Sequence, residues 1–164
     1  MKILRAAGLL LLVVVLSGCA SKFRTYDGPE VTRINVMKGQ RQLYLMNGST
    51  TLKVYKIGLG FAPVGDKKIE GDGKTPEGVY YVNRRNPNSL YHLSVGISYP
   101  SPADAAEAAD LGKSPGGDIF IHGRGKLYKA GKQDWTAGCI AVKDREIEEI
   151  YAMVKDGTPI VIYP

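Results

Sequence analysis

The sequence is poor in the residues that build metal centres and disulfide frameworks. Its 164 residues include two cysteines, two histidines and one tryptophan. Two histidines cannot form a histidine-rich metal site and neither cysteine has a neighbouring thiol, so we expect no structural zinc. The longest apolar run, residues 6–16, is too short to cross a bilayer as a helix. The length suits one domain.

Charge says little about a partner. The formal net charge is +6, yet there is no dense stripe of Lys and Arg interleaved with aromatic residues. The sequence therefore does not favour nucleic-acid binding. A mildly basic surface would suit an acidic polymer such as the bacterial cell wall, but it would equally serve solubility alone. Charge does not decide between these two interpretations.

The first 19 residues have the pattern of an export signal. Lys2 and Arg5 precede the apolar run, which is followed by Leu16-Ser17-Gly18-Cys19. This segment resembles a bacterial lipoprotein signal, in which Cys19 would be lipidated and become the first residue. The alternative is an ordinary secretory signal with a chance cysteine. The resemblance implies a periplasm-facing protein held at the membrane by acyl chains, and Ala20 after the cysteine favours the outer membrane.

The rest of the chain predicts a mostly β domain with short helices over residues 31–164, after a short tether at 19–30. Asn47-Gly48 between alternating residues predicts a hairpin at 41–56, and the second strand is expected to reach Leu59. A loop is predicted at 61–78. Further strands are predicted at 79–83, 93–99, 118–122 and 159–163, and helices at 103–111 and 144–155. Asp144 is expected to cap the second helix.

The second cysteine, Cys139, is a candidate nucleophile. If Cys19 is acylated, Cys139 has no partner for an internal disulfide, and a lone thiol is a liability in an oxidising compartment unless it is used. His122 lies 17 positions upstream and could take the thiol proton. Gly123 and Gly138 beside the pair would let the backbone approach a substrate. A buried structural cysteine beside a core histidine is the alternative.

Longer motifs carry a family resemblance. Ile121-His122-Gly123 followed by Thr136-Ala137-Gly138-Cys139-Ile140 resembles the catalytic signature of the L,D-transpeptidase (YkuD-type) domain. The segment from Gly71 to Gly78 and the hairpin from Ile34 to Leu59 are also similar to that family. The resemblance covers residues 31–164. It implies a β-sandwich or barrel that acts on peptidoglycan stem peptides without a cofactor.

The resemblance also implies roles for individual residues. Cys139 would attack an L,D carbonyl to form a thioester, and His122 would be the general base, oriented by the backbone carbonyl of Gly123. The amides of Gly138 and Cys139 would bind the oxyanion. The sequence departs from the common family pattern at two positions, where Ala137 replaces a frequent His and Ala141 a frequent Arg. These departures leave donor specificity and cross-linking open.

Four more residues are candidates for substrate binding, and each has a plainer interpretation. His92 could line the groove or be a surface or core histidine. Trp135 could stack on substrate or anchor the core, and Thr136 could bond near the site or finish a turn. Arg124, with Lys126, Lys129 and Lys132, could attract carboxylates or belong to a solvated loop. Asp118 and Asp134 are possible groups to orient the histidine, although the family does not require one.

The sequence therefore predicts a thiol acyltransferase on peptidoglycan peptides. A hydrolase with the same dyad, releasing a terminal residue or a wall-linked protein, is the first alternative. An inactive wall-binding lipoprotein is the second.

Overall fold

A computed structural model describes residues 21–126, 128 and 131–164 of the chain, so residues 1–18 and Cys19 lie outside the described residues. The elements follow one another as β1 (Arg33–Met37), β2 (Gln42–Asn47), β3 (Thr50–Lys56), β4 (Gly78–Asn86), β5 (Ser94–Ile97), α1 (Pro102–Asp110), β6 (Phe120–His122), β7 (Ile140–Ala141), α2 (Asp144–Met153) and β8 (Pro159–Tyr163). The domain is thus mostly β with two short helices, as the sequence predicts.

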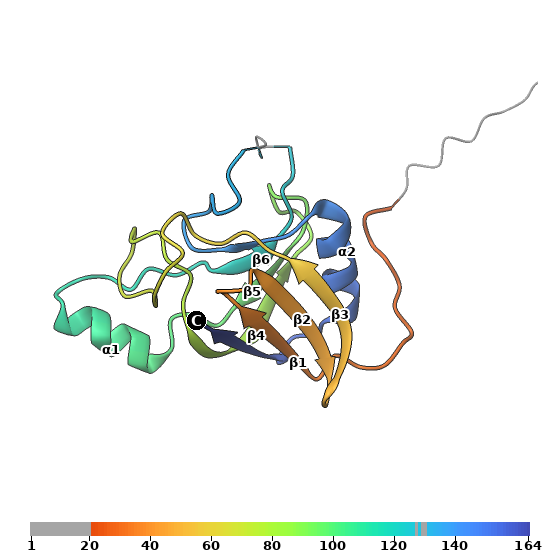
Figure 1. The fold of residues 1–164 in the computed structure, drawn as a ribbon, viewed down its shortest axis with the longest axis horizontal. Helices are drawn as coiled ribbons and strands as arrows, with labels where there is room; N and C mark the ends of the chain where they lie inside the picture. Colours follow the sequence, from red (N-terminus) through yellow and green to blue (C-terminus); the bar gives the residue numbers. More distant parts are fainter. Residues whose placement is uncertain (1–20, 127, 129–130) are drawn as a thin grey trace, which may run out of the picture.

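The strands form one curled sheet with the order β3-β2-β1-β8-β4-β5-β6-β7. The last strand in the chain, β8, lies between β1 and β4, parallel to the first and antiparallel to the second. The two edges of the sheet approach each other, because Gly58, just after β3, forms a β-bridge with Ala141 of β7. The sheet is therefore curled, with β1–β3 in front of β5 and β6 in the view of Figure 1.

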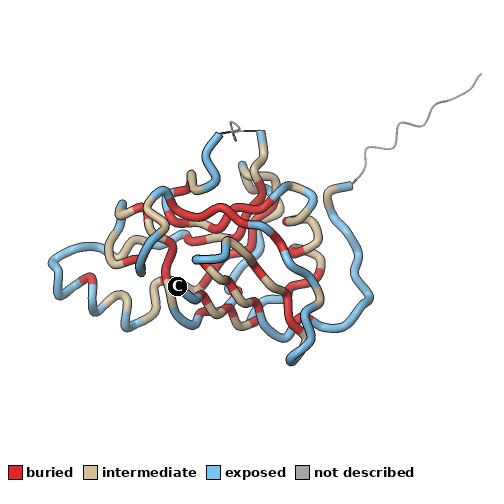
Figure 2. Tube along the Cα trace, viewed as in Figure 1, coloured by how far each residue is buried: buried red, intermediate tan, exposed pale blue. Residues whose placement is uncertain are grey.

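The core fills the inside of the curled sheet and the space beneath α2 (Figure 2). Ile147, Ile150 and Met153 form the buried stripe of α2, which packs against β5 and β6. Every residue of β5 is buried, since this strand has the helix on one face and the sheet interior on the other. The strand predicted at 93–99 is thus confirmed as the shorter strand β5.

Several predicted elements are confirmed. The hairpin at 41–56 is β2 and β3, joined at Gly48, whose φ of 56° suits the turn. The final strand is β8. Helix α1 begins after Ser101, whose hydroxyl accepts from the Asp104 amide at 3.3 Å, and the Asp104 carboxylate accepts in return from the Ser101 amide at 2.7 Å. The strand predicted at 79–83 is longer, running to Asn86.

The predicted cap of the second helix is wrong. Lys143 is the N-cap residue of α2, and the side chain of Glu146 accepts a hydrogen bond from the Lys143 amide. Asp144 is instead the first helical residue. Its carboxylate accepts from the amides of Arg124 and Gly125 at 2.7 and 2.9 Å. These two amides belong to the loop after β6, and their need for an acceptor draws the carboxylate away from its own helix.

The loop at 61–78 is organised by two buried lysines. Lys38 donates to the carbonyls of Gly65 and Thr75 and forms an ion pair of 2.8 Å with Glu77. Lys67 is buried against Asp72 at 2.9 Å. A buried charge is tolerated only when it is paired and hydrogen-bonded, so these contacts hold the loop in one conformation. The loop packs against the backbone at Gly138, beside the candidate site.

Residues 21–30 contain no helix or strand, and several of their side chains contact the domain. Lys22 Nζ donates to the carbonyl of Pro87 at 2.6 Å, and Arg24 forms an ion pair of 2.8 Å with Glu148 of α2. The ring of Phe23 lies against Tyr151. This segment therefore runs along the α2 side of the domain (Figure 1). Among the residues that the structure describes, no helix is long and apolar enough to cross a membrane.

Candidate active site

Two short parallel strands bring His122 and Cys139 to one pocket. Strand β6 ends at His122, and β7 begins directly after Cys139, with Ile121 opposite Ile140 and His122 opposite Ala141. Both side chains line a pocket of about 290 Å³. Its other lining residues are Asn86, Ser89, Leu90, Tyr91, Ser94, Asp118 and Phe120.

The closure of the sheet fixes the cysteine strand from its other side. Ala141 exchanges two backbone hydrogen bonds with Gly58, at 2.8 and 2.9 Å. Two residues further along, Gly60 forms a bridge with Thr136. The segment that carries Cys139 is therefore held between β6 and residues 58–60, which restricts the position of the thiol relative to His122.

His122 is held in a defined tautomer and orientation. Its Nδ1 lies 2.5 Å from the carbonyl oxygen of Gly123, which can only accept, so Nδ1 carries the proton and Nε2 is left as an acceptor. The ring packs against Tyr91, with centroids 4.5 Å apart, and meets Trp135 edge-on at 5.7 Å. Burial lowers the pKa of His122 and the Gly123 carbonyl acts against this, so the imidazole is neutral at pH 7.

Cys139 is half-buried, and its sulfur lies against the backbone of residues 118–120. Sγ is 3.5 Å from the carbonyl oxygen of Asp118. Burial raises the pKa of the thiol, an effect that a hydrogen bond from the Phe120 backbone opposes. Both shifts favour the neutral forms, a thiol and an imidazole, and a neutral thiol needs a base in order to react.

The turn before the cysteine is closed by Thr136, which is buried. Its hydroxyl donates to the carbonyl oxygen of Cys139 at 2.6 Å and accepts from the Gly138 amide at 3.2 Å. The Gly138 amide thus already has an acceptor. Oxyanion binding by the amides of Gly138 and Cys139 stays a prediction, and in this structure the first of the two is hydrogen-bonded to Thr136.

Gly138 is required by its surroundings. Its φ is 141°, a conformation that side chains disfavour, and a Cβ here would lie 2.7 Å from the carbonyl oxygen of Lys74. The loop at 61–78 therefore packs directly against the backbone that precedes the nucleophile. This contact gives the segment from Gly71 to Gly78 a structural role at the site.

Of the other predicted site residues, the structure places some beside His122 and Cys139 and others at neighbouring pockets. Trp135 packs on His122, and Thr136 shapes the turn. His92 does not line the Cys139 pocket; its Nε2 lies 2.8 Å from Glu148, beside a neighbouring pocket. Arg124 lines a third pocket. Lys129 lies outside the described residues.

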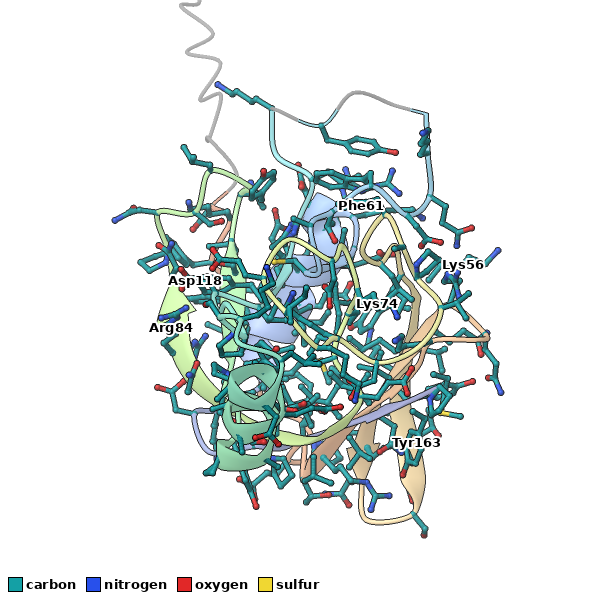
Figure 3. The ribbon with its side chains drawn as sticks, turned by 90° about the vertical axis from the view of Figure 1, so that its left-hand side faces the viewer. Lys56, Phe61, Lys74, Arg84, Asp118 and Tyr163 are labelled. Atoms are coloured by element: carbon teal, nitrogen blue, oxygen red, sulfur yellow. The ribbon has the colours of Figure 1, made fainter. Side chains whose placement is uncertain are left out.

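Neither candidate aspartate orients the histidine through its carboxylate. The Asp118 carboxylate pairs with Arg84 at 2.5 Å, at the edge of the molecule where Figure 3 labels both residues. The Asp134 carboxylate pairs with Arg41 at 2.9 Å and accepts from the amide of Leu59. Asp134 thus braces the segment that closes the sheet. The described residues include no group of three or more His, Cys, Asp or Glu side chains placed to hold a metal ion.

Two residues of the site escape prediction from the sequence. Tyr91 stacks on His122, and Asp144 holds the loop after Gly123 through the amides of Arg124 and Gly125. A tyrosine before a strand and an acid at a helix start have common structural explanations, so the sequence carries no signal for either role. Only the tertiary arrangement brings them to the site.

A buried histidine, held by a backbone carbonyl, shares a pocket with a cysteine on a curled β sheet, and this arrangement is suited to acyl transfer. The YkuD family model, described as the L,D-transpeptidase catalytic domain, matches residues 31–162. The chain therefore belongs to the YkuD L,D-transpeptidase family.

Two relatives are consistent with this assignment. The chain is 31% identical over 144 residues to YafK of Escherichia coli (strain K12), which is named "Putative L,D-transpeptidase". The aligned region covers 80% of this chain and 53% of YafK. The crystal structure of Pgp2 from Campylobacter jejuni, a helical cell shape determining protein, matches with a TM-score of 0.64 and 28% identity, over 84% of this chain and 49% of that one.

The fold also matches an L,D-transpeptidase of Enterococcus faecium, with a TM-score of 0.54 and 18% identity, over 82% of this chain and 50% of that one. At this identity the likeness shows the fold alone. The chain spans about half the length of the relatives it matches.

Proposed function

We propose that the chain is a cysteine-dependent acyltransferase on peptidoglycan stem peptides, an L,D-transpeptidase with a thioester intermediate. One observation carries this proposal. His122 is fixed with Nε2 as an acceptor by its 2.5 Å contact with Gly123, and it lines the same pocket as the Cys139 thiol. Family membership points to the substrate class.

The first half-reaction forms the thioester. His122 Nε2 takes the thiol proton while Cys139 Sγ attacks the carbonyl carbon of an L,D peptide bond. The Cys139 amide donates to the oxyanion of the tetrahedral intermediate. As the intermediate collapses, the C–N bond breaks and the leaving amine takes the proton from His122. The acyl group remains on sulfur.

The second half-reaction releases the acyl group and regenerates the free thiol of Cys139. The amine of a second stem peptide attacks the thioester carbon and gives its proton to His122. The C–S bond then breaks, and the sulfur regains a proton from the imidazolium. Each bond that breaks is matched by one that forms, so the cycle needs no redox or electrophilic cofactor. Water in place of the amine would give a hydrolase.

The deciding experiment supplies purified disaccharide-tetrapeptide to the detergent-solubilised full chain and follows products by mass spectrometry. We expect a cross-linked dimer, or exchange of the terminal D-residue when a free D-amino acid is added. Cys139→Ala should abolish both products while its thermal unfolding stays close to that of the wild type. Simple loss of the terminal residue, without dimer or exchange, would overturn transfer in favour of hydrolysis.

The inactive wall-binding alternative makes a different prediction. A chain with an inert Cys139 would bind the muropeptide without forming a covalent adduct, whereas the transferase should be acylated by a carbapenem at Cys139 and not in Cys139→Ala. Intact-protein mass spectrometry reads this out directly. Absence of the adduct would contradict the thioester mechanism.

We further propose that Cys19 is lipidated and that the enzyme faces the periplasm from the outer membrane. The support is the sequence alone: an apolar run, Leu16-Ser17-Gly18-Cys19, and Ala20. Labelling of cells with an alkyne fatty acid should mark the wild type and not Cys19→Ser. Recovery of an unlabelled wild type from the soluble periplasmic fraction would overturn the anchor.

A further inference from the structure

A second pocket lies next to the candidate active site, and one of its lining residues, Trp135, contacts His122. It has a volume of about 390 Å³ and shares no lining residue with the Cys139 pocket. Its lining includes Lys56, Arg124, Tyr128, Lys132, Trp135 and Lys143. We refer to it below as the cationic pocket.

The charge of the cationic pocket is of one sign. Lys56, Arg124, Lys132 and Lys143 line it, and none of its described lining residues is acidic. Within the described part of the chain, only Lys143 of these four has an ion-pair partner, Glu146 at 3.6 Å. Four like charges around one cavity repel each other, and an anion inside would relieve this repulsion.

The neighbouring acids are already engaged elsewhere. The Asp144 carboxylate holds the amides of Arg124 and Gly125. The Asp134 carboxylate is paired with Arg41. Neither acid therefore neutralises the cationic pocket through a direct contact with its side-chain cations.

Arg124 is poised to bind a planar anion. Its guanidinium carbon lies 4.6 Å from the ring centroid of Tyr128, so the side chain rests on the aromatic face. Its Nε is buried and has no hydrogen-bond partner in the described structure. A buried donor without an acceptor is costly, and a carboxylate that bonds Nε together with a terminal nitrogen would satisfy it.

Trp135 connects the cationic pocket with the catalytic histidine. It lines the cationic pocket, and its ring centroid is 5.7 Å from those of His122 and Tyr91, which line the Cys139 pocket. Trp135 therefore lies at a boundary between the two pockets. A tetrapeptide, which spans roughly 13 Å when extended, is long enough to lie across one such side chain.

We propose that the cationic pocket binds a free carboxylate of the peptide substrate, with Arg124 as its principal ligand. The inference rests on the proposed function, because it assigns the pocket to the substrate of Cys139. Lys56, Lys132 and Lys143 attract the anion from the rim, and the planar fork of Arg124 selects a carboxylate. The pocket therefore discriminates between acidic and amidated stem peptides.

The test compares two muropeptides that differ only in whether their side-chain carboxylate is free or amidated. Binding is measured by calorimetry on the full chain in detergent, with Cys139→Ala as the background so that no turnover occurs. We expect tighter binding of the free acid, weakening as salt rises. Arg124→Gln should weaken binding of the free acid roughly 10- to 100-fold and leave the amide unchanged.

Matched variants make the result specific. Arg145→Gln removes the same charge from an exposed position on α2 and should change neither affinity. Arg124→Lys should recover part of the free-acid affinity. Equal binding of the two muropeptides by the wild type, or an equal loss for both in Arg124→Gln, would overturn the inference.

Failure of the proposed function is distinguishable from failure of the inference. If the free-acid peptide binds through Arg124 but Cys139 never forms a thioester, the cationic pocket stands and the catalytic proposal falls. If the thioester forms at the same rate with acid and amide in the wild type, catalysis stands and the carboxylate site falls.

Discussion

The hydroxyl of Thr136 donates to the carbonyl oxygen of Cys139 over 2.6 Å and accepts from the amide of Gly138 at 3.2 Å. One buried side chain therefore binds two backbone groups next to the nucleophile, the N–H of Gly138 and the C=O of Cys139. This explains a threonine at the start of the turn, and it shows that the Gly138 amide has a partner within the protein. The position of the thiol depends on this hydroxyl.

Removing that hydroxyl should loosen the nucleophile. Thr136→Val keeps the shape of the side chain but leaves a buried amide and a buried carbonyl without this partner, so we expect a loss of about 2–3 kcal/mol in the free energy of unfolding. The rate of thioester formation should fall at least about tenfold, because a small displacement of a reacting atom is costly. Urea unfolding and carbapenem acylation measure the two effects. Thr136→Ser keeps the hydroxyl and should stay close to the wild type; a valine variant as stable and reactive as the serine variant would contradict the role.

Asp72 should contribute to stability in an acid-sensitive way. Its carboxylate accepts from Lys67 Nζ at 2.9 Å and from the amides of Lys68, Ile69 and Lys74 at 2.8, 3.1 and 3.0 Å. Burial opposes ionisation, but these donors outweigh it and hold the pKa at about 2. Since the unfolded carboxyl titrates near pH 3.9, the native state is favoured above that pH, and this contribution is lost as the pH falls from about 4 to 2.

The measurement is the free energy of unfolding at pH 7 and pH 3. Asp72→Asn leaves the buried Lys67 ammonium without its partner, so we expect a loss of about 3 kcal/mol at pH 7. The variant should lose less stability than the wild type between pH 7 and pH 3, because it lacks the shifted group. Asp27→Asn removes an exposed carboxylate and serves as the control. Parallel pH profiles for wild type and Asp72→Asn would show that other groups set the acid sensitivity.

Local chemistry explains the parts of the fold that were predictable. Asn47-Gly48 determines the hairpin of β2 and β3, and Ser101 begins α1, because turn and cap geometry depend on a few adjacent residues. The pairing of β8 between β1 and β4 depends on segments far apart in the chain, and no local pattern reports it. The same holds for Gly58 and Ala141, whose bridge closes the sheet.

In the candidate site, too, residues in local motifs are predictable and residues that act through contacts far apart in the chain are not. His122 and Cys139 stand in recognisable motifs, so both were named from the sequence. The sequence predicts Asp144 as a helix cap, because no local pattern shows that the amides of Arg124 and Gly125 need its carboxylate. The hydrogen bond from the Gly138 amide to the Thr136 hydroxyl likewise becomes visible only in the folded turn. Side chains that act across the fold are those that sequence patterns miss.

The protonation states of the dyad predict how reactivity depends on pH. Burial lowers the pKa of His122 below its usual value of about 6.5. Burial raises the pKa of Cys139, although the Phe120 amide opposes this shift. Both partners are thus neutral around pH 7. Peptide turnover, which needs neutral His122 as base, should rise along an acid limb centred below pH 6.5 and form a plateau through neutral pH.

Direct alkylation tests the same assignment without a substrate. Iodoacetamide reacts with the thiolate form of a cysteine. Alkylation of Cys139 should therefore be slow at pH 6 and should rise only at pH values above about 8.5, the ordinary pKa of a thiol. His122→Gln should remove turnover but leave the alkylation profile nearly unchanged, since the imidazole does not hold a thiolate in the resting state. A Cys139 that alkylates rapidly at pH 6 in the wild type, and slowly in His122→Gln, would instead establish a thiolate–imidazolium pair. The histidine would then act on the thiol before substrate arrives, rather than during its attack.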